Sequence, residues 1–154
     1  MVKISKALHA DAEPEEVLSG LLDSSINPPG MTMAPVYEVP GREGSVYEWS
    51  FKIVGVPQKG IMIITGYVPG KRLSTRNLGA LESTSTMTFE PENKGTRVTM
   101  NGESRLTFPL IGRFLDSFLE RGMLRNTEWT MRQVEMRHAK KGGHGHVTRV
   151  AGSA

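Results

Sequence analysis

The sequence contains no cysteine. This absence excludes disulfide bonds, thiolate catalysis and cysteine-based zinc sites, and it is compatible with a reducing cytoplasm. No run approaches the roughly 18 consecutive apolar residues of a membrane-spanning helix. Residues 1–5 show no charged region followed by an apolar run, so they do not resemble a secretory signal. Together these absences predict a cytoplasmic protein without integral membrane association.

Acidic residues are scarce near the C-terminus, and this local imbalance produces the basic character of the chain. The formal net charge is +3 over 154 residues. From Arg132 onward only Glu135 is acidic, against five basic residues: Arg132, Arg137, Lys140, Lys141 and Arg149. The rest of the chain is close to neutral, so the sequence predicts no nucleic-acid partner. A hydrophobic content of 38% and a charged content of 23% suit one globular domain.

Motifs that mark well-known catalytic and metal sites are also missing. The chain has no HExxH, Walker or GxGxxG motif in a supporting context, and no Ser-His-Asp arrangement. His144 and His146 stand in a glycine-rich run without further ligands, so they predict no metal site. His9 and His138 are isolated. The sequence therefore predicts no metal and no cofactor, and it leaves the catalytic residues, if any, unassigned.

One long amphipathic stretch, residues 109–139, organises the chain. Pro109 suits a first helical turn, and a helix of about 30 residues spans roughly 45 Å. Only a broad, curved sheet could pack along that length. One face of the helix carries apolar residues together with a glycine and two amides: Ile111, Leu115, Phe118, Gly122, Asn126, Trp129, Gln133 and Met136. Because buried amides need partners, the helix is expected to cover a cavity as well as a core.

The middle of the chain alternates apolar and polar residues with a period of two. This pattern predicts strands at 36–39, 45–54, 61–68, 72–78, 81–90 and 96–108, joined by short turns as in an antiparallel meander. A first strand over 2–10 and a short helix starting near Pro14 precede them, and 23–33 is expected to be irregular. Residues 1–139 therefore form a single domain, and 140–154 form a flexible, basic tail rich in Gly and His.

Small and polar residues share the expected inner faces of the later strands with bulky apolar ones. Ser83 and Ser85 lie on one such face, Gly102 and Ser104 on the next, and Thr75 and Asn77 on a third. This mixture is typical of a small-molecule site, although strands can also simply tolerate Ser and Thr. The aromatic residues of 45–54 could equally be core, and the helix amides could be satisfied at a helix–sheet seam. The predicted ligand-binding residues are Trp49, Phe51, Met87, Met100, Gly102, Phe118, Gly122, Asn126 and Trp129.

Three stretches, in order, carry a resemblance to a known superfamily. They are the helix start Ala-Glu-Pro-Glu-Glu-Val at 12–17, the turn Gly-Tyr-Val-Pro-Gly-Lys-Arg-Leu at 66–73, and the hairpin Phe-Glu-Pro-Glu-Asn-Lys-Gly-Thr-Arg-Val-Thr at 89–99. Over about residues 2–139 the chain resembles the polyketide cyclase/START-like (SRPBCC, Bet v 1-like) superfamily. The resemblance implies an α+β helix-grip fold. In that fold a curved antiparallel sheet wraps around a long C-terminal helix, with one or two short helices after the first strand.

The resemblance implies a cavity, not one reaction. Members of the superfamily bind lipids, sterols, polyketides and plant hormones, and some cyclise or hydrolyse them, without a shared catalytic motif. Many relatives carry a Trp-Pro segment where this chain has Ile-Asn-Pro-Pro-Gly at 26–30, so the mouth of the pocket is expected to differ there.

An enzyme would need an acid/base pair in the cavity, and the expected inner faces supply no clear His, Asp or Glu. The sequence therefore favours binding or transport of a small hydrophobic or amphipathic ligand, lipid- or polyketide-like. The alternative is a cyclase, aromatase or dehydratase acting in the same cavity. A co-chaperone-like module would need an exposed apolar patch. A monomer or a homodimer is expected.

Overall fold

The computed structural model describes the backbone of residues 2–53, 55–107 and 112–153, and within them the side chains of 3–52, 55–105, 107 and 120–140. The elements follow in the order β1 (Val2–Ala10), α1 (Pro14–Leu21), β2 (Met31–Tyr37), β3 (Val46–Ile53), β4 (Val56–Val68), β5 (Arg72–Gly79), β6 (Leu81–Glu92), β7 (Gly95–Leu106) and α2 (Gly112–Ser153).

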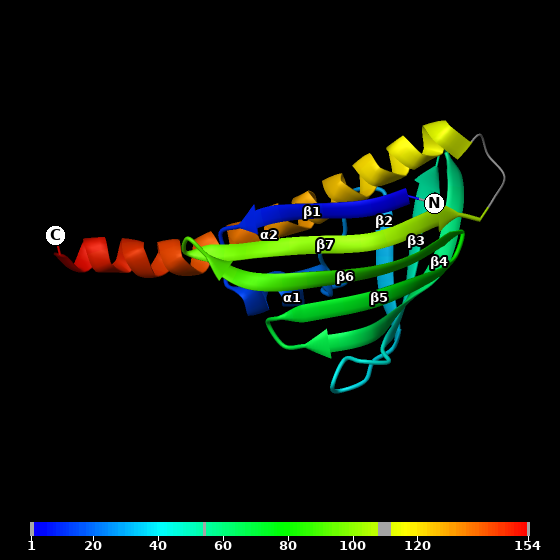
Figure 1. Cartoon of the computed structure of the whole chain (residues 1–154). Coiled ribbons are helices and arrows are strands. Elements are labelled where there is room, and N and C mark those ends of the chain that lie inside the picture. The colour runs from blue at the N-terminus through cyan, green and yellow to red at the C-terminus, as the bar shows by residue number, and fades with distance from the viewer. Residues whose placement is uncertain (1, 54, 108–111, 154) are drawn as a thin grey trace.

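The seven strands form one antiparallel sheet in the order β1-β7-β6-β5-β4-β3-β2. β2 to β7 are therefore a meander, and β1 returns to pair with β7 along its whole length, from Val2 opposite Ser104 to Ala10 opposite Thr96. The sheet curves, with α2 and α1 on one side of it (Figure 1). This arrangement confirms the predicted α+β helix-grip fold, with one short helix after the first strand.

The core lies where α1 and the middle of α2 meet the sheet. Val17 and Leu18 of α1 are buried with Ile64 and Val98 of the sheet, and Met131 of α2 packs against them. Burial of each such side chain contributes about 1.5–3 kcal/mol. Three arginines of α2 off its apolar face are exposed (Arg121, Arg132 and Arg137). Trp129 is partly buried rather than fully buried, and the side chain of Phe118 lies outside the described residues.

Two strand starts differ from the sequence prediction. β2 begins at Met31, opposite Phe51, so the predicted strand 36–39 was placed several residues too late. Pro35 obscured this strand, but β2 is an edge strand, where a residue without an N–H is tolerated. β4 begins at Val56, opposite Ile53, where a turn over 56–60 was expected. Gly55 has a φ of 79°, and this left-handed conformation allows the tight connection.

The turn between β6 and β7 is tighter than the predicted loop over 91–95. Glu92 pairs with Gly95, so only Asn93 and Lys94 remain outside the ladder. Both have positive φ, 43° and 62°, which is the geometry of a two-residue hairpin with the same twist as the flanking strands.

α2 continues beyond the predicted end at Ala139. The described helix runs from Gly112 to Ser153, so the predicted helix end was wrong, and Pro109 lies outside the described residues. The glycines after Lys141 lower helix propensity, but the chain has no proline after Pro109 that would stop a helix. In Figure 1 the C-terminal end of α2 extends past the sheet.

The contribution of the C-terminal segment can be tested by truncation. Deletion of residues 142–154 should change the free energy of unfolding by no more than about 0.5 kcal/mol, because this end of the helix extends away from the sheet. Chemical denaturation of the full and truncated chains measures the difference. A clear loss of stability would contradict the prediction that 140–154 is a flexible appendage of the domain.

A histidine at the end of β1 makes the stability of the sheet edge depend on pH. His9 Nδ1 lies 3.1 Å from Glu92 Oε2, and Nε2 lies 2.9 Å from Asp11 Oδ1. The hydrogen bond to Glu92, followed by that to Asp11, raises the pKa of His9 above its ordinary value. The charged imidazole is therefore favoured in the folded state. Its stabilising contribution is complete below the unfolded pKa and disappears as the pH rises through the folded pKa.

His9→Asn should therefore lower the Tm most in mildly acidic solution. The Tm difference from the wild type should be largest below about pH 6 and should shrink above about pH 8. Thermal unfolding across this range measures it. A Tm difference that stays constant with pH would show that His9 acts through packing, not through its charge.

Candidate functional site

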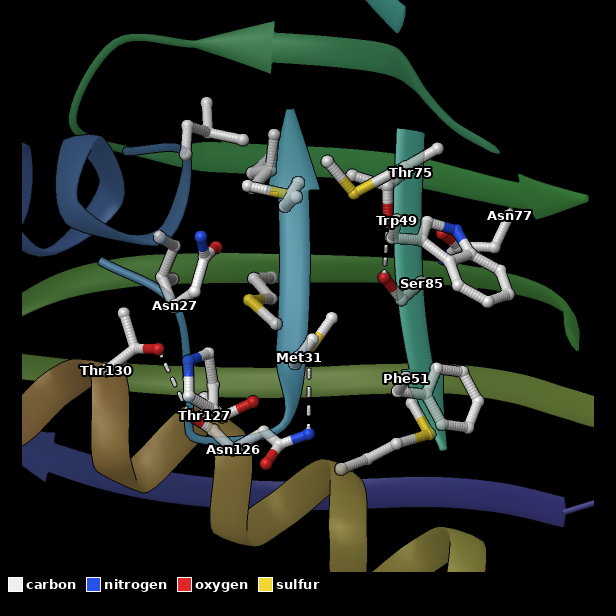
Figure 2. A pocket seen from close by; sticks show the side chains of 18 of the residues that line it. Asn27, Met31, Trp49, Phe51, Thr75, Asn77, Ser85, Asn126, Thr127 and Thr130 are labelled. Atoms are coloured by element: carbon white, nitrogen blue, oxygen red, sulfur yellow. Dashed lines mark hydrogen bonds between the residues drawn. The ribbon is translucent and has the colours of Figure 1, made fainter. Parts of the chain in front are cut away.

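A cavity of about 220 Å³ lies between the sheet, α2 and the chain that leads from α1 into β2. Its wall is formed by side chains from β2 to β7, by the end of α1 with the segment after it, and by α2 (Figure 2). Because strands present alternate residues to each face, one face of each strand supplies the lining.

Methionines dominate the apolar part of the wall. Six of the nine methionines in the chain line the cavity: Met31, Met33, Met62, Met87, Met100 and Met123. Trp49 and Phe51, neighbours on one face of β3, are stacked with their ring centroids 5.3 Å apart. Methionine is flexible and polarisable, so this wall can adapt its shape and make favourable sulfur–aromatic contacts.

Several polar groups of the wall have hydrogen-bond partners within the protein. The hydroxyls of Thr75 and Ser85 lie 2.9 Å apart, and Asn77 Nδ2 donates to Ser83 Oγ at 2.8 Å. On α2, the Thr130 hydroxyl donates to the Asn126 carbonyl oxygen at 3.1 Å, and Asn126 Nδ2 lies 3.7 Å from Met31 Sδ (Figure 2). Paired hydroxyls and amides reduce the cost of burial, so the cavity is largely apolar in character.

One donor in the wall is left without a partner. Trp49 is only 5% exposed, and its Nε1 is the sole buried side-chain nitrogen or oxygen without a hydrogen bond in the part of the chain whose side chains are described. An unpaired buried N–H costs free energy. Nε1 is itself enclosed by protein atoms although the Trp49 side chain lines the cavity, so a bound acceptor would reach this N–H only if the indole ring moved.

The described wall contains no ionisable side chain. No Asp, Glu, His, Lys, Arg or Tyr is among its residues. Strand alternation explains this, because Glu48 and Lys52 of β3 and Arg76 of β5 are exposed, whereas Trp49 and Thr75 beside them are buried. The cavity can enclose a molecule and hydrogen-bond to it, and the residues of its wall whose side chains are described offer no charge.

Five of the nine predicted site residues are brought together in this wall: Trp49, Phe51, Met87, Met100 and Asn126. Thr75, Asn77 and Ser85 also line it, as their strand positions predicted. Trp129 lies instead in a second, smaller pocket with Gln133 and Met136. The side chain of Phe118 is outside the described residues.

The two predicted glycines do not line the cavity. A Cβ at Gly102 would lie 2.8 Å from the Thr84 carbonyl oxygen and 3.1 Å from Ser85 Cβ. A large side chain there would therefore collide with the sheet, not fill a void. A Cβ at Gly122 would meet no atom within 4 Å, so that helix position is open but is not part of the wall.

The sequence analysis missed the side of the cavity that lies before β3. Ile26, Asn27 and Pro28 line it from the segment expected to be merely irregular, and Met31 and Met33 line it from the misplaced strand. The alternation of Met31 and Met33 around Thr32 was the available signal. The Ile-Asn-Pro-Pro-Gly segment, where the chain departs from the superfamily pattern, therefore contributes directly to the cavity.

Two polar contacts outside the cavity link α2 to α1 and to the segment that follows α1. His138 Nδ1 lies 2.9 Å from Glu16 Oε1, and Arg137 Nη1 lies 3.0 Å from Asp23 Oδ2. The Ser25 hydroxyl, followed by its backbone N–H and Arg137, lowers the pKa of Asp23 below its ordinary value, so this carboxylate stays charged. Within the described residues, no group of three or more His, Asp or Glu could hold a metal ion. Over the described residues, neither helix is long and apolar enough to cross a membrane.

Comparison with known proteins agrees with this architecture. The Zhui aromatase/cyclase from Streptomyces sp. R1128 superposes with a TM-score of 0.67 at 14% identity, covering 90% of this chain and 94% of that one. A START superfamily protein from Mycobacterium smegmatis gives 0.69 at 14% identity, covering 90% and 97%. The protein TTHA0849 from Thermus thermophilus gives 0.69 at 21% identity, covering 90% and 98%. At these identities the likeness shows the fold.

The family is identified by comparison of the sequence with models of protein families. No curated protein matches the chain significantly. The family model described as polyketide cyclase / dehydrase and lipid transport matches residues 1–146, which is nearly the whole chain. The protein therefore belongs to the polyketide cyclase/dehydrase and lipid transport family, with the helix-grip fold of the START superfamily.

Proposed function

We propose that this protein binds or carries a small hydrophobic ligand in the cavity between the sheet and α2. Family and fold indicate a hydrophobic ligand-binding or polyketide cyclase-like protein. The observation that favours binding is the wall of the cavity, which is rich in methionine and, over its described residues, free of ionisable groups. Affinity would come from burial of apolar area, at about 25 cal/mol per Å², and orientation from a few hydroxyls and amides.

A cyclase, aromatase or dehydratase is the second candidate, because relatives with this fold include an aromatase/cyclase. General acid–base catalysis needs a positioned group with a suitable pKa, most often His, Glu, Asp, Lys or Tyr. The buried Tyr47 lies outside the cavity in a pocket with Glu38 and Arg42, and burial raises the pKa of its hydroxyl above the ordinary value. It therefore offers no base to a molecule in the cavity. The cytoplasmic location and the monomeric or dimeric state remain predictions from the sequence.

A variant that fills the cavity tests the proposed function. Thr127 lines the cavity from α2, so Thr127→Phe places a ring in the space without removing a strand residue. The neutral dye N-phenyl-1-naphthylamine, whose fluorescence rises in apolar surroundings, serves as the probe. The wild type should bind it, and Thr127→Phe should bind it at least about tenfold more weakly, because the volume and apolar area available to the dye are reduced.

Glu128→Phe is the matched control, because Glu128 is exposed on the same helix one residue further on. It should leave dye binding unchanged. Native mass spectrometry of protein purified without detergent should then reveal any co-purified molecule, and this molecule should be missing from Thr127→Phe. Equal dye binding by the wild type and both variants would reject the cavity as the site.

A further inference from the structure

We propose that the cavity selects a compact, uncharged aromatic molecule with a hydrogen-bond acceptor and rejects the same skeleton when it carries a charge. This inference rests on the proposed function and adds the chemical class of the ligand. Three independent features of the wall carry it: the absence of charge, the sulfur-rich surface and the unpaired indole N–H.

The first feature is that nothing in the described wall can compensate a buried charge. A charged group that leaves water loses its hydration, and only a close opposite charge or several hydrogen bonds repay that loss. Several polar groups of the wall already have protein partners: Thr75 pairs with Ser85, Asn77 donates to Ser83, and Thr130 donates to a backbone carbonyl oxygen. A carboxylate or an ammonium group enclosed here would remain uncompensated.

Charged residues close to the cavity in the sequence are engaged elsewhere. Asp23, next to the lining residue Leu22, hydrogen-bonds Ser25 and pairs with Arg137. Glu82, next to the lining residue Leu81, accepts hydrogen bonds from Arg105 at 2.9 and 2.5 Å. On α2, Arg125 and Glu128 flank the lining residues Asn126 and Thr127, but both are exposed. None of these groups is a counter-ion for a ligand in the cavity.

The second feature is the affinity of the wall for aromatic rings. Six thioether side chains and the stacked Trp49–Phe51 pair surround the space. Sulfur–aromatic contacts contribute about 0.3–1.5 kcal/mol each, and the indole and phenyl rings can stack on or meet the edge of a flat ligand. A volume of about 220 Å³ is below the roughly 300–1,000 Å³ of sites for drug-sized molecules. The fitting ligand is therefore a compact aromatic molecule of two or three rings, not a long chain.

The third feature is the buried Nε1 of Trp49, which donates to no group of the protein among the described residues. Because the Trp49 ring lines the cavity, a small rotation of the ring on ligand binding would present this unpaired N–H to a carbonyl, amide or ether oxygen. The wall thus discriminates among neutral aromatics as well, in favour of those with an acceptor.

A set of ligands with one skeleton tests the charge selectivity on the wild-type protein. The ligands are 2-naphthamide, 2-naphthoate and 2-naphthylmethylammonium, all small enough that the charged group must enter the cavity. Calorimetric titration at pH 7 should show the amide binding at least about 100-fold more tightly than either ion, because an uncompensated buried ion costs several kcal/mol. Equal affinity for the amide and the carboxylate would overturn the proposal.

The pH dependence of the carboxylate gives a second readout. If only the neutral acid binds, the apparent affinity for 2-naphthoate should rise about tenfold for each pH unit between pH 7 and pH 5, because the protonated fraction of the ligand rises by that factor. The affinity for 2-naphthamide should not change, since it does not titrate. A flat profile for the carboxylate would contradict exclusion of charge.

The preference for a ligand with a hydrogen-bond acceptor is tested with Trp49→Phe. This variant removes the indole N–H and keeps an aromatic ring. The wild type should prefer 2-naphthamide to 2-methylnaphthalene, and this preference should fall by about fivefold or more in Trp49→Phe. Binding of N-phenyl-1-naphthylamine by the variant shows that the cavity has survived. An unchanged preference would reject Trp49 as the donor.

The outcomes separate this inference from the proposed function. Failure of every ligand, including N-phenyl-1-naphthylamine, would reject the binding function itself. Binding of the dye together with equal binding of 2-naphthamide and 2-naphthoate would leave the binding function intact and overturn the charge selectivity. Binding of the dye without 2-naphthamide would overturn the assignment to compact aromatics.

Discussion

Gly20→Ala should lower the free energy of unfolding by about 1–3 kcal/mol, although alanine is the better helix former. Gly20 is buried on α1, where a Cβ would lie closer than 3.0 Å to Val134 Cγ2 of α2. Val134 is β-branched and therefore stiff in a helix, so it cannot simply turn away. The added methyl should push the two helices apart and loosen the core that they share with the sheet. Urea denaturation measures the loss.

In a Val134→Ala background, the destabilising effect expected of Gly20→Ala should disappear or change sign. Val134→Ala alone removes two buried methyl groups and should cost about 1–2 kcal/mol. In that background the space for the new Cβ is open, so Gly20→Ala should be neutral or should stabilise by up to about 1 kcal/mol through helix propensity. The coupling energy of the double-mutant cycle is the decisive quantity. Simple additivity of the two changes would show that Gly20 does not set the distance between α1 and α2.

The strongly periodic parts of the chain were predictable from the sequence because one physical constraint dominates each of them. β1 was predicted over its observed range, since its two faces differ in polarity and any shift of register would expose the apolar one. The hairpin of β6 and β7 and the long helix followed from similarly strong patterns. The direction in which Thr75, Asn77 and Ser85 point was predictable for the same reason.

The features of the fold and the cavity that were not predicted depended on distances between atoms, which a sequence pattern does not contain. The alternation of the strand predicts Gly102 on the inner face, but Gly102 does not line the cavity beneath α2, and a Cβ there would lie 2.8 Å from the Thr84 carbonyl oxygen. Pro28, Pro29 and Pro35 concealed the edge strand with Met31 and Met33, because proline argues against a strand unless the edge position is known. The neutrality of the described wall could not be predicted from one strand alone, because residues of six strands, β2 to β7, form that wall.

The pairing of Gly60 with Trp49 leads to the second large expected effect. The two residues are opposite each other on β4 and β3, and a Cβ at Gly60 would lie closer than 3.0 Å to Cζ2 and Cη2 of the indole. It would also lie 2.5 Å from the Leu78 carbonyl oxygen, which belongs to the backbone and cannot yield easily. Gly60→Ala should therefore cost about 1–3 kcal/mol and displace the Trp49 ring into the cavity.

The displacement should be visible in both fluorescence and binding. In a Trp129→Phe background Trp49 is the only tryptophan, so its emission reports the position of its ring directly. Gly60→Ala should shift this emission and should weaken N-phenyl-1-naphthylamine binding by about tenfold, because the ring would occupy space that the dye needs. Gly66→Ala is the control on the same strand, since its Cβ would meet only the Ser74 side chain, at 3.3 and 3.4 Å. If Gly60→Ala binds the dye as well as Gly66→Ala does, the indole does not form the wall of the site, and the assignment of Trp49 as the ligand's hydrogen-bond donor fails with it.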